Sequence, residues 1–212
     1  MRHPRVLLAD DHTFLVEGLR KLLKSAYHVV GMVADGLALL DAAPALKPDV
    51  IIIDIGMPRL NGLEAARQLK KIMPEVKFIF LTMNEDSDIA VEAMHVGASG
   101  YVLKTSAASE LFDAIDAALK GKSYVTPKIA LGMQEASIQN PQGKNRGKLL
   151  TLRQREIIYL LAAGKSMREA ADILKVTPST IAFHKYSMMR KLGIKTSAEL
   201  IRVGLEKRVL AA

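Results

Sequence analysis

The chain has 212 residues, half of them hydrophobic, with no cysteine and a formal net charge of +8. This length allows one or two modest hydrophobic cores, and the apolar content excludes a disordered chain. Without cysteine there is no disulfide or thiolate chemistry. No run approaches the ~18 consecutive apolar residues of a membrane span, and the start of the chain has no signal-peptide core, so we expect a cytoplasmic protein without membrane contact.

The charge is divided unevenly along the chain. Residues 1–125 carry 14 basic and 16 acidic residues, a net charge of −2, whereas residues 126–212 carry 16 and 6, a net charge of +10. A basic part joined to a nearly neutral one suggests that the second part binds a polyanion such as nucleic acid. A solvated lysine-rich surface is the plainer alternative.

Five short apolar runs alternate with helical patterns up to about residue 121. The expected strands are Arg5–Ala9, His28–Val33, Asp49–Ile53, Val76–Leu81 and Ser99–Leu103, and the expected helices are 12–25, 37–46, 63–73, 88–96 and 108–120. Strands separated by helices predict βαβ units and a parallel sheet. The expected fold is therefore α/β and flavodoxin-like, a doubly wound five-stranded parallel sheet.

The run Val50–Ile53 is apolar at every position, which is typical of a central strand covered on both faces. It leads directly to Asp54, at the carboxyl edge of the sheet, where open α/β sheets place their ligand sites. Further on, Asn61 with Glu64 three residues later predicts the N-cap of the next helix.

Polar residues follow the other strands at the same edge. Asp10 and Asp11 follow the first strand, Thr82 follows the fourth and Lys104 follows the fifth, so the fold brings them to Asp54. Three close carboxylates repel one another, and Mg²⁺ is the usual cation that relieves such repulsion at phosphate sites. With the charge of Lys104 added, the pocket can accept a phosphoryl group on Asp54 as nucleophile. Taken singly, each residue can instead be a turn cap or a surface side chain.

Residues 1–122 resemble the receiver domain of two-component response regulators through LLADDH, DIGMPRLNG, FLTM and GASGYVLK, in that order. The resemblance implies that a partner sensor histidine kinase phosphorylates Asp54. It also implies that Asp11, Asp54 and the backbone carbonyl of Gly56 hold Mg²⁺, with Asp10 close by.

The same resemblance implies that Thr82 bonds the phosphoryl oxygen, that Tyr101 swings inward behind it and that Lys104 contacts the phosphate. Gly56 stands where bulkier residues are frequent in the family, and Asn84 lies two residues beyond Thr82. Both flank the path of an attacking water, so the lifetime of the phosphorylated state stays open.

Lys104 is followed by Thr105, where many relatives have proline. A cis peptide bond costs ~3–4 kcal/mol without proline. We nevertheless expect a cis bond between Lys104 and Thr105, because Lys104 must be aimed at the phosphate.

Residues 123–148 form the expected linker between a domain of residues 1–122 and one of residues 149–212. Ile129–Ala136 can form one or two helical turns, and the polar stretch SIQNPQGKNRGK, residues 137–148, predicts a flexible tether.

The second domain has four helix starts in under fifty residues. They are the capping boxes Thr151–Gln154, Ser166–Glu169 and Thr196–Glu199, and the pair Thr177-Pro178. The expected helices are 152–163, 167–174, 178–191 and 197–208, with Gly164 and Gly193 as C-terminal stops. A tight turn joins the second and third helices, which predicts an all-α helix-turn-helix domain.

The third helix is the expected recognition helix, with Ile181, Met188 and Leu192 facing inward. The expected DNA-binding residues are Lys165, Ser166, Thr177, Ser179, Thr180, Ala182, Phe183, His184, Lys185, Tyr186, Arg190 and Lys191. Phe183 and Tyr186 are unusual on an outer face and can meet thymine methyl groups or sugars. Packing against a neighbouring helix is the alternative for both.

Residues 149–205 resemble the LuxR-type helix-turn-helix domain of the NarL/FixJ subfamily. The matching residues are Thr151, Arg153, Glu156, Gly164, Ser166, Ala170, Thr180, His184, Lys191 and Leu192. The resemblance implies a homodimer formed through the last helix and binding to paired half-sites on double-stranded DNA. Gln154, Met167-Arg168 and Ala182-Phe183 depart from the common pattern, which leaves the base preference open.

The leading hypothesis is a phosphorylation-switched transcription factor that is not an enzyme. A phosphatase or phosphotransferase with Asp54 as nucleophile is a second hypothesis, although no His or carboxylate closely follows Asp54 to activate water. A DNA-binding protein whose receiver serves only for dimerisation, without phosphorylation, is a third.

Overall fold

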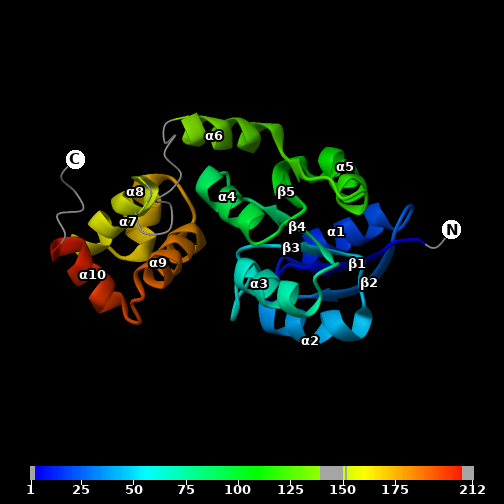
Figure 1. Ribbon diagram of the computed structural model, residues 1–212, viewed down its shortest axis with the longest axis horizontal. Coiled ribbons are helices and arrows are strands. Elements are labelled where there is room, and N and C mark those ends of the chain that lie inside the picture. The colour runs from blue at the N-terminus through cyan, green and yellow to red at the C-terminus, as the bar shows by residue number, and fades with distance from the viewer. Residues whose placement is uncertain (1–2, 139–149, 151, 207–212) are drawn as a thin grey trace. The chain divides into compact units, whose positions relative to one another are not determined.

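The computed structural model describes residues 3–138, 150 and 152–206 of the chain, coloured from blue to red in Figure 1. The chain divides into two units, Met1–Ser137 and Ile138–Ala212. The first unit therefore includes residues 123–137 of the expected linker 123–148. The tether expected at 137–148 lies largely outside the described residues.

The first unit is built on a parallel sheet in the order β2-β1-β3-β4-β5-β6. The strands are β1 (Arg5–Ala9), β2 (His28–Val33), β3 (Val50–Ile53), β4 (Lys77–Thr82), β5 (Gly100–Leu103) and β6 (Tyr124–Val125). The flavodoxin-like, doubly wound arrangement is confirmed, but the sheet has six strands and not five. The extra strand, Tyr124–Val125, is too short to give an apolar pattern of its own.

Helices cover both faces of this sheet (Figure 1). The helices of this unit are α1 (Thr13–Leu23), α2 (Gly36–Leu46), α3 (Gly62–Ile72), α4 (Ser87–His95), α5 (Ala107–Leu119) and α6 (Pro127–Ile138), with a 3-10 turn at Lys104–Ser106. One face is covered by α1 and α5, whose apolar residues share a core with alternate residues of the strands. The opposite face carries α2, α3 and α4.

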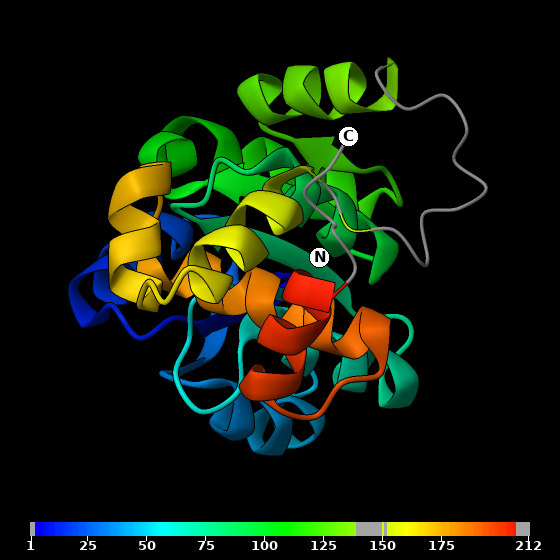
Figure 2. The same ribbon diagram turned by 90° about the vertical axis from the view of Figure 1, so that its left-hand side faces the viewer.

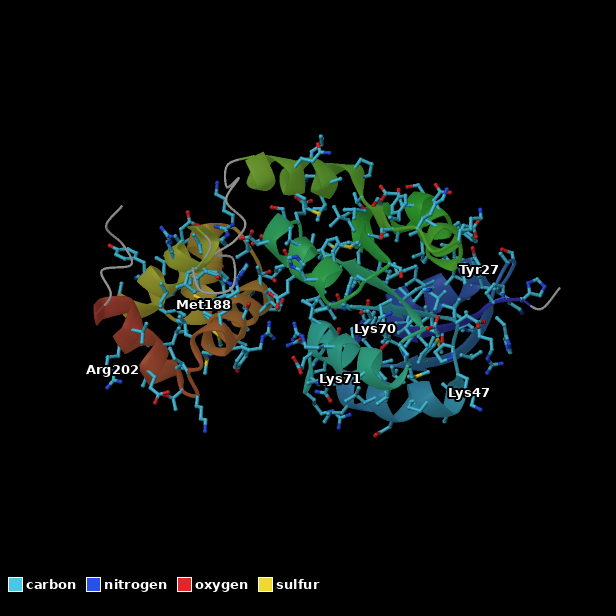
Figure 3. The ribbon with its side chains drawn as sticks, in the orientation of Figure 1. Tyr27, Lys47, Lys70, Lys71, Met188 and Arg202 are labelled. Carbon is cyan, nitrogen blue, oxygen red and sulfur yellow. The ribbon has the colours of Figure 1, made fainter. Side chains whose placement is uncertain are left out.

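Tyr27 closes the core between α1 and α5, as labelled in Figure 3. Its ring stacks on Phe112 with centroids 5.9 Å apart, and its hydroxyl donates to Asp116 Oδ1 at 2.8 Å. Burial, followed by the Asp116 carboxylate, raises the pKa of Tyr27 above its ordinary value. The hydroxyl therefore stays protonated and keeps its hydrogen bond.

Helix starts on the functional edge of the sheet follow the sequence signals. Asn61 caps α3 as expected, with its side chain accepting a hydrogen bond from Glu64 N at 2.9 Å. Asp35 caps α2 and Asp86 caps α4 in the same manner. These caps fix where each loop at the carboxyl edge turns into its helix.

In residues 152–206, the second unit forms the four expected helices, coloured from yellow to red in Figure 2. They are α7 (Leu152–Ala162), α8 (Met167–Leu174), α9 (Pro178–Leu192) and α10 (Ser197–Glu206). Met188 of α9 is wholly buried in their shared core. Among the residues that the structure describes, no helix combines the length and the apolar character needed to cross a membrane.

The helix ends of the second unit have the expected chemistry. Ser166 and Glu169 form a complete capping box, and Thr177 caps α9 by accepting a hydrogen bond from Thr180 N at 3.2 Å. Gly164 and Gly193 have φ of +82° and +68°, the left-handed conformation that ends a helix. The box expected at Thr151 lies outside the described residues.

Candidate functional site

Asp54 stands at the carboxyl end of β3 and is almost wholly buried. Its backbone N–H donates to Ala9 O at 2.7 Å, which ties the residue to β1, and its carboxylate accepts a hydrogen bond from the backbone N–H of Gly56. The backbone of Gly62 packs closely against that of Asp54, because a Cβ placed on Gly62 would lie 2.1 Å from the Asp54 carbonyl oxygen. Only glycine leaves room for this backbone.

Lys104 brings a positive charge into the same pocket from the end of β5. Its ammonium Nζ lies 2.7 Å from Asp10 Oδ2 and 3.2 Å from Asp54 Oδ2, and all three side chains are at most 6% exposed. These groups follow three different strands, so the parallel sheet assembles them as the sequence predicted.

The expected cis bond between Lys104 and Thr105 is wrong, because the described residues contain no cis peptide bond. Lys104 instead begins the 3-10 turn Lys104–Ser106 and reaches both carboxylates from a trans backbone. The side chain has enough length for this, so nothing offsets the ~3–4 kcal/mol cost of a cis bond.

Two further groups complete the rim of the pocket. Asp11 is exposed, and His12 Nδ1 lies 2.9 Å from Asp10 Oδ1 and 3.1 Å from Asp11 Oδ1. Ligand atoms of Asp10, Asp11, His12 and Asp54 all lie within 4.8 Å of one another. The sequence reasoning missed His12, although its place directly after the Asp10-Asp11 pair was a usable signal.

This donor set suits a hard divalent cation. Asp10 Oδ2 is buried, and Lys104 Nζ is its ion-pair partner at 2.7 Å. Carboxylate oxygens at this spacing are the ligands that Mg²⁺ prefers. The residues present therefore match the acidic cluster that receiver domains use for the ion.

Burial raises the pKa of Asp54 above its ordinary value. The neighbouring carboxylate of Asp10 raises it further, whereas the Lys104 ammonium and the Gly56 N–H oppose the shift. The negative charge on Asp54 is therefore costly in the metal-free protein, and a nearby cation relieves this cost.

Thr82 and Tyr101 meet at one loop residue, Asn84. The Thr82 hydroxyl accepts a hydrogen bond from Asn84 N at 3.1 Å, and the Tyr101 hydroxyl donates to Asn84 O at 2.8 Å. Tyr101 is wholly buried, and burial followed by the carboxylates of Asp86 and Asp54 raises its pKa. In this structure Tyr101 already points inward.

An ion pair that the sequence reasoning missed holds the loop between β3 and α3. Arg59, whose φ is +62°, pairs with Asp35 at the start of α2. Next to it, a Cβ on Gly36 would lie 2.1 Å from Leu60 O, so the loop lies directly on the α2 N-terminus. The loop that carries Gly56 is thereby fixed from two sides.

The residues expected to bind DNA do not all share one exposed surface. Exposed side chains belong to Lys165, Ser166, Thr177, Ser179, Tyr186 and Arg190, partly exposed ones to Ala182, Phe183, Lys185 and Lys191, and buried ones to Thr180 and His184. Ten of the twelve are thus at least partly exposed; seven of these ten lie on α9, and Lys165, Ser166 and Thr177 precede it.

Thr180 and His184 differ from the other residues expected to bind DNA, because their side chains are buried. Thr180 is 3% exposed and its hydroxyl bonds Thr177 Oγ1 at 2.9 Å, within the cap of α9. His184 is 1% exposed and meets the Phe183 ring edge-on at 5.4 Å. Their helical spacing places both beside Ile181 and Met188 on the inner stripe, so their side chains face the core.

The two outer aromatic residues differ. Phe183 is half-buried, as the packing alternative requires, whereas Tyr186 is 56% exposed with Lys185 Nζ 5.0 Å from its ring centroid. Tyr186 is thus available to a partner on the same face as Lys185.

Two family matches account for both units. Residues 6–116, more than half of the chain, match the response regulator receiver domain, and residues 148–203 match bacterial regulatory proteins of the luxR family. The chain belongs to the response regulators with a LuxR-type DNA-binding domain.

Full-length relatives agree with this membership. This response regulator is 30% identical over 209 residues to the transcriptional regulatory protein MctR of Rhizobium johnstonii, covering 98% of this chain and 95% of that protein. It is 32% identical over 214 residues to the oxygen regulatory protein NreC of Staphylococcus aureus, covering 97% and 99%.

Solved structures of a relative show the same architecture. RcsB of Salmonella enterica serovar Typhimurium, bound to a promoter in the presence of phosphomimetic beryllofluoride, is 28% identical with a TM-score of 0.64, covering 99% of this chain and 100% of that one. Another structure holds two RcsB dimers bound to two parallel DNAs, at 30% identity, a TM-score of 0.63 and coverage of 95% and 97%. The present response regulator is thus a DNA-binding transcriptional regulator of a two-component system, controlled by phosphorylation and partnered by a histidine kinase.

Proposed function

We propose that Asp54 is the phosphoacceptor of this response regulator. The observation that carries the proposal is the buried ammonium of Lys104, which lies within 3.2 Å of both Asp54 and Asp10. A positive charge held there before reaction is preorganised for the phosphoryl oxygens. Asp54 supplies the nucleophilic oxygen on the rigid end of a central strand.

The transfer forms one bond and breaks one. An Asp54 carboxylate oxygen attacks phosphorus, the P–N bond to the kinase histidine breaks, and the imidazole leaves with its electron pair. Asp11, Asp54 and the Gly56 carbonyl, with Asp10 close by, would hold Mg²⁺. When bound, this ion neutralises charge on the transferring oxygens. Lys104 then pairs with the new phosphoryl group.

Phosphorylation of Asp54 alters the loop after β4 through Thr82 and Tyr101. The Thr82 hydroxyl exchanges its contact with Asn84 N for a phosphoryl oxygen, while Tyr101 stays inward on Asn84 O. The face formed by residues 83–106 is remodelled, and dimerisation and DNA binding change with it.

The DNA interface is the outer face of α9. Ser179, Ala182, Phe183, Lys185, Tyr186 and Arg190 face the major groove or its rim, while Lys165, Ser166 and Thr177 meet phosphates near the starts of α8 and α9. Lys191, whose ammonium donates to Gln154 Oε1 at 3.4 Å, lies at the flank of α9 and meets a phosphate there. Dimerisation through α10 and paired half-sites extend this proposal, and the RcsB dimers on DNA support it. Such a regulator acts in the cytoplasm, where its DNA lies.

Operator binding and sedimentation test the proposal, each with and without acetyl phosphate plus Mg²⁺. The wild type is expected to shift toward dimers and to bind paired half-sites more tightly with the phosphodonor. Asp54→Asn is expected to respond to neither. Equal responses of the two proteins would overturn Asp54 as the phosphoacceptor.

A further inference from the structure

Backbone hydrogen bonds attach the segment after α5 to β5, the strand that carries Tyr101. We call β5 the switch strand. β6 pairs with β5 in the register Gly100 with Tyr124 and Tyr101 with Val125. Tyr124 N donates to Ser99 O at 3.0 Å, and Thr126 N donates to Tyr101 O at 2.9 Å. The backbone of Tyr101 is therefore bonded directly to the segment that leads into α6.

The side chain of Thr126 adds a second connection, at the end of the same strand. Thr126 is 4% exposed, its hydroxyl donates to Glu110 Oε2 at 2.6 Å, and it accepts a hydrogen bond from Leu103 N at 3.2 Å. Leu103 directly precedes Lys104, so the Thr126 hydroxyl bonds the last strand residue before the Lys104 side chain. Glu110 fixes the direction of the hydroxyl proton, which leaves a lone pair for Leu103.

The helix that follows lies on the loop that Thr82 and Tyr101 share. Lys128 Nζ of α6 lies 2.5 Å from Glu85 Oε2, next to Asn84. A Cβ on Gly132 would lie 3.4 Å from Ser87 Cβ, so the backbone of α6 runs in van der Waals contact with the start of α4. Figure 1 shows α6 beside α4.

We infer that Thr126 is a positioning residue for Lys104 and the point at which the switch strand is coupled to α6. The segment Tyr124–Ile138 then has two contacts with the switch, one through Tyr101 and Leu103 on β5 and one through the loop at Glu85–Ser87. A change at Asp54 that moves Thr82, Asn84 or Tyr101 must alter at least one of them. This inference rests on the proposed function. It identifies α6 as the first element to respond when Asp54 is modified.

A plainer role for β6 is to cover the open edge of β5. That role predicts a constant protection of α6, independent of what is bound at Asp54. Coupling predicts a protection that depends on the pocket. Hydrogen exchange of the full chain, measured by mass spectrometry with and without beryllofluoride plus Mg²⁺, separates the two.

In the wild type, the amides of residues 128–134 are expected to change their exchange rate when beryllofluoride binds. Thr126→Val keeps the shape but loses both hydroxyl bonds, so α6 is expected to exchange about 10-fold faster in both states and to lose the response. Thr126→Ser restores the hydroxyl and is expected to restore the response. Lys128→Ala removes an exposed ion pair and is expected to leave the β5 connection intact.

A second readout tests the positioning of Lys104. The rate of phosphoryl uptake from acetyl phosphate is expected to fall about 10-fold in Thr126→Val and to recover in Thr126→Ser. If Thr126→Val does not fold, Glu110→Ala, which removes the acceptor of the hydroxyl proton, is expected to show the same two losses.

An α6 response in Thr126→Val equal to that of the wild type overturns the coupling. A wild type that binds beryllofluoride without any change in the amides of residues 128–134 overturns it as well. Binding itself is followed independently by ¹⁹F resonance. A wild type that binds no beryllofluoride overturns the proposed function at Asp54 and this inference with it.

Discussion

The ammonium group of Lys104 lies 3.2 Å from the carboxylate of Asp54, and both side chains are 6% exposed. The two residues follow β5 and β3, which are separated by β4 in the sheet. The lysine side chain therefore spans the end of a strand to reach its partner. The positive charge is in place before a phosphoryl group arrives, so little reorganisation is needed during transfer.

Replacement of Lys104 by methionine is expected to separate metal binding from phosphoryl transfer. Without the ammonium, the pocket is more negative, so its affinity for Mg²⁺ should be unchanged or higher. Phosphoryl uptake from acetyl phosphate should slow by about 100-fold, the usual cost of removing a preorganised charge donor. Titration calorimetry and uptake kinetics measure the two quantities.

Lys128→Met is the matched control, because it removes a lysine charge whose ion pair with Glu85 is exposed. It should keep the wild-type uptake rate. A Lys104→Met protein that takes up phosphoryl groups as fast as this control would remove Lys104 from the mechanism.

Asp54→Asn is expected to stabilise the metal-free protein at neutral pH. Because burial raises the pKa of Asp54 in the folded state, the folded protein binds this proton more readily than the unfolded chain does. Its free energy of unfolding therefore falls as the pH rises from the unfolded carboxyl value of about 3.9 through the raised pKa. Asparagine removes this penalty, and Lys104 keeps Asp10 as its partner.

The expected gain at pH 7 is about 1 kcal/mol, the size that relief of a destabilised functional site commonly gives. Thermal unfolding of both proteins across pH, with and without Mg²⁺, measures it. The difference should shrink at acidic pH and on addition of Mg²⁺. A variant less stable than the wild type at pH 7 would show that Asp54 is not electrostatically strained.

Gly62→Ala should destabilise the protein by about 2 kcal/mol or more, because the new Cβ would overlap the Asp54 carbonyl oxygen at 2.1 Å. Gly18→Ala is the control. No atom lies within 4 Å of a Cβ at Gly18, inside α1, so alanine should stabilise by about 0.5–1 kcal/mol. Urea unfolding measures the change in the free energy of unfolding for both variants. Changes of the same sign would contradict the close approach of Gly62 to Asp54.

Lys185→Ala is expected to weaken DNA binding at all sequences and to lower the slope of log affinity against log salt by about one, as loss of one phosphate contact requires. Lys71→Ala removes the same charge from α3 of the receiver (Figure 3). It should leave the salt slope unchanged. Equal slopes for the two variants would place the DNA interface elsewhere than the outer face of α9.

Much of this site follows from the sequence because parallel strands deliver their carboxyl ends to one edge. Asp10, Asp54, Thr82 and Lys104 each follow an apolar run, so their meeting depends only on the sheet. Helix starts were equally predictable, since Asn61, Ser166 and Thr177 use local hydrogen bonds that a short motif encodes.

Features that depend on distant partners could not be read from the sequence. β6 has two residues and exists because β5 offers a free edge, and Arg59 finds Asp35 only once α2 and the loop after β3 are packed. A missed signal was local: Thr126-Pro127 repeats the Thr-Pro pair of Thr177-Pro178, which had marked a helix start. The inward turn of His184 likewise needed the packed core of α9.

Reductive trapping measures the central claim most directly. The full chain is treated with acetyl phosphate and Mg²⁺, reduced with borohydride to convert an acyl phosphate to homoserine, and mapped by peptide mass spectrometry. Modification at residue 54 alone, and none in Asp54→Asn, is the predicted result. Modification at Asp10, at Asp11 or at no carboxylate would contradict the account.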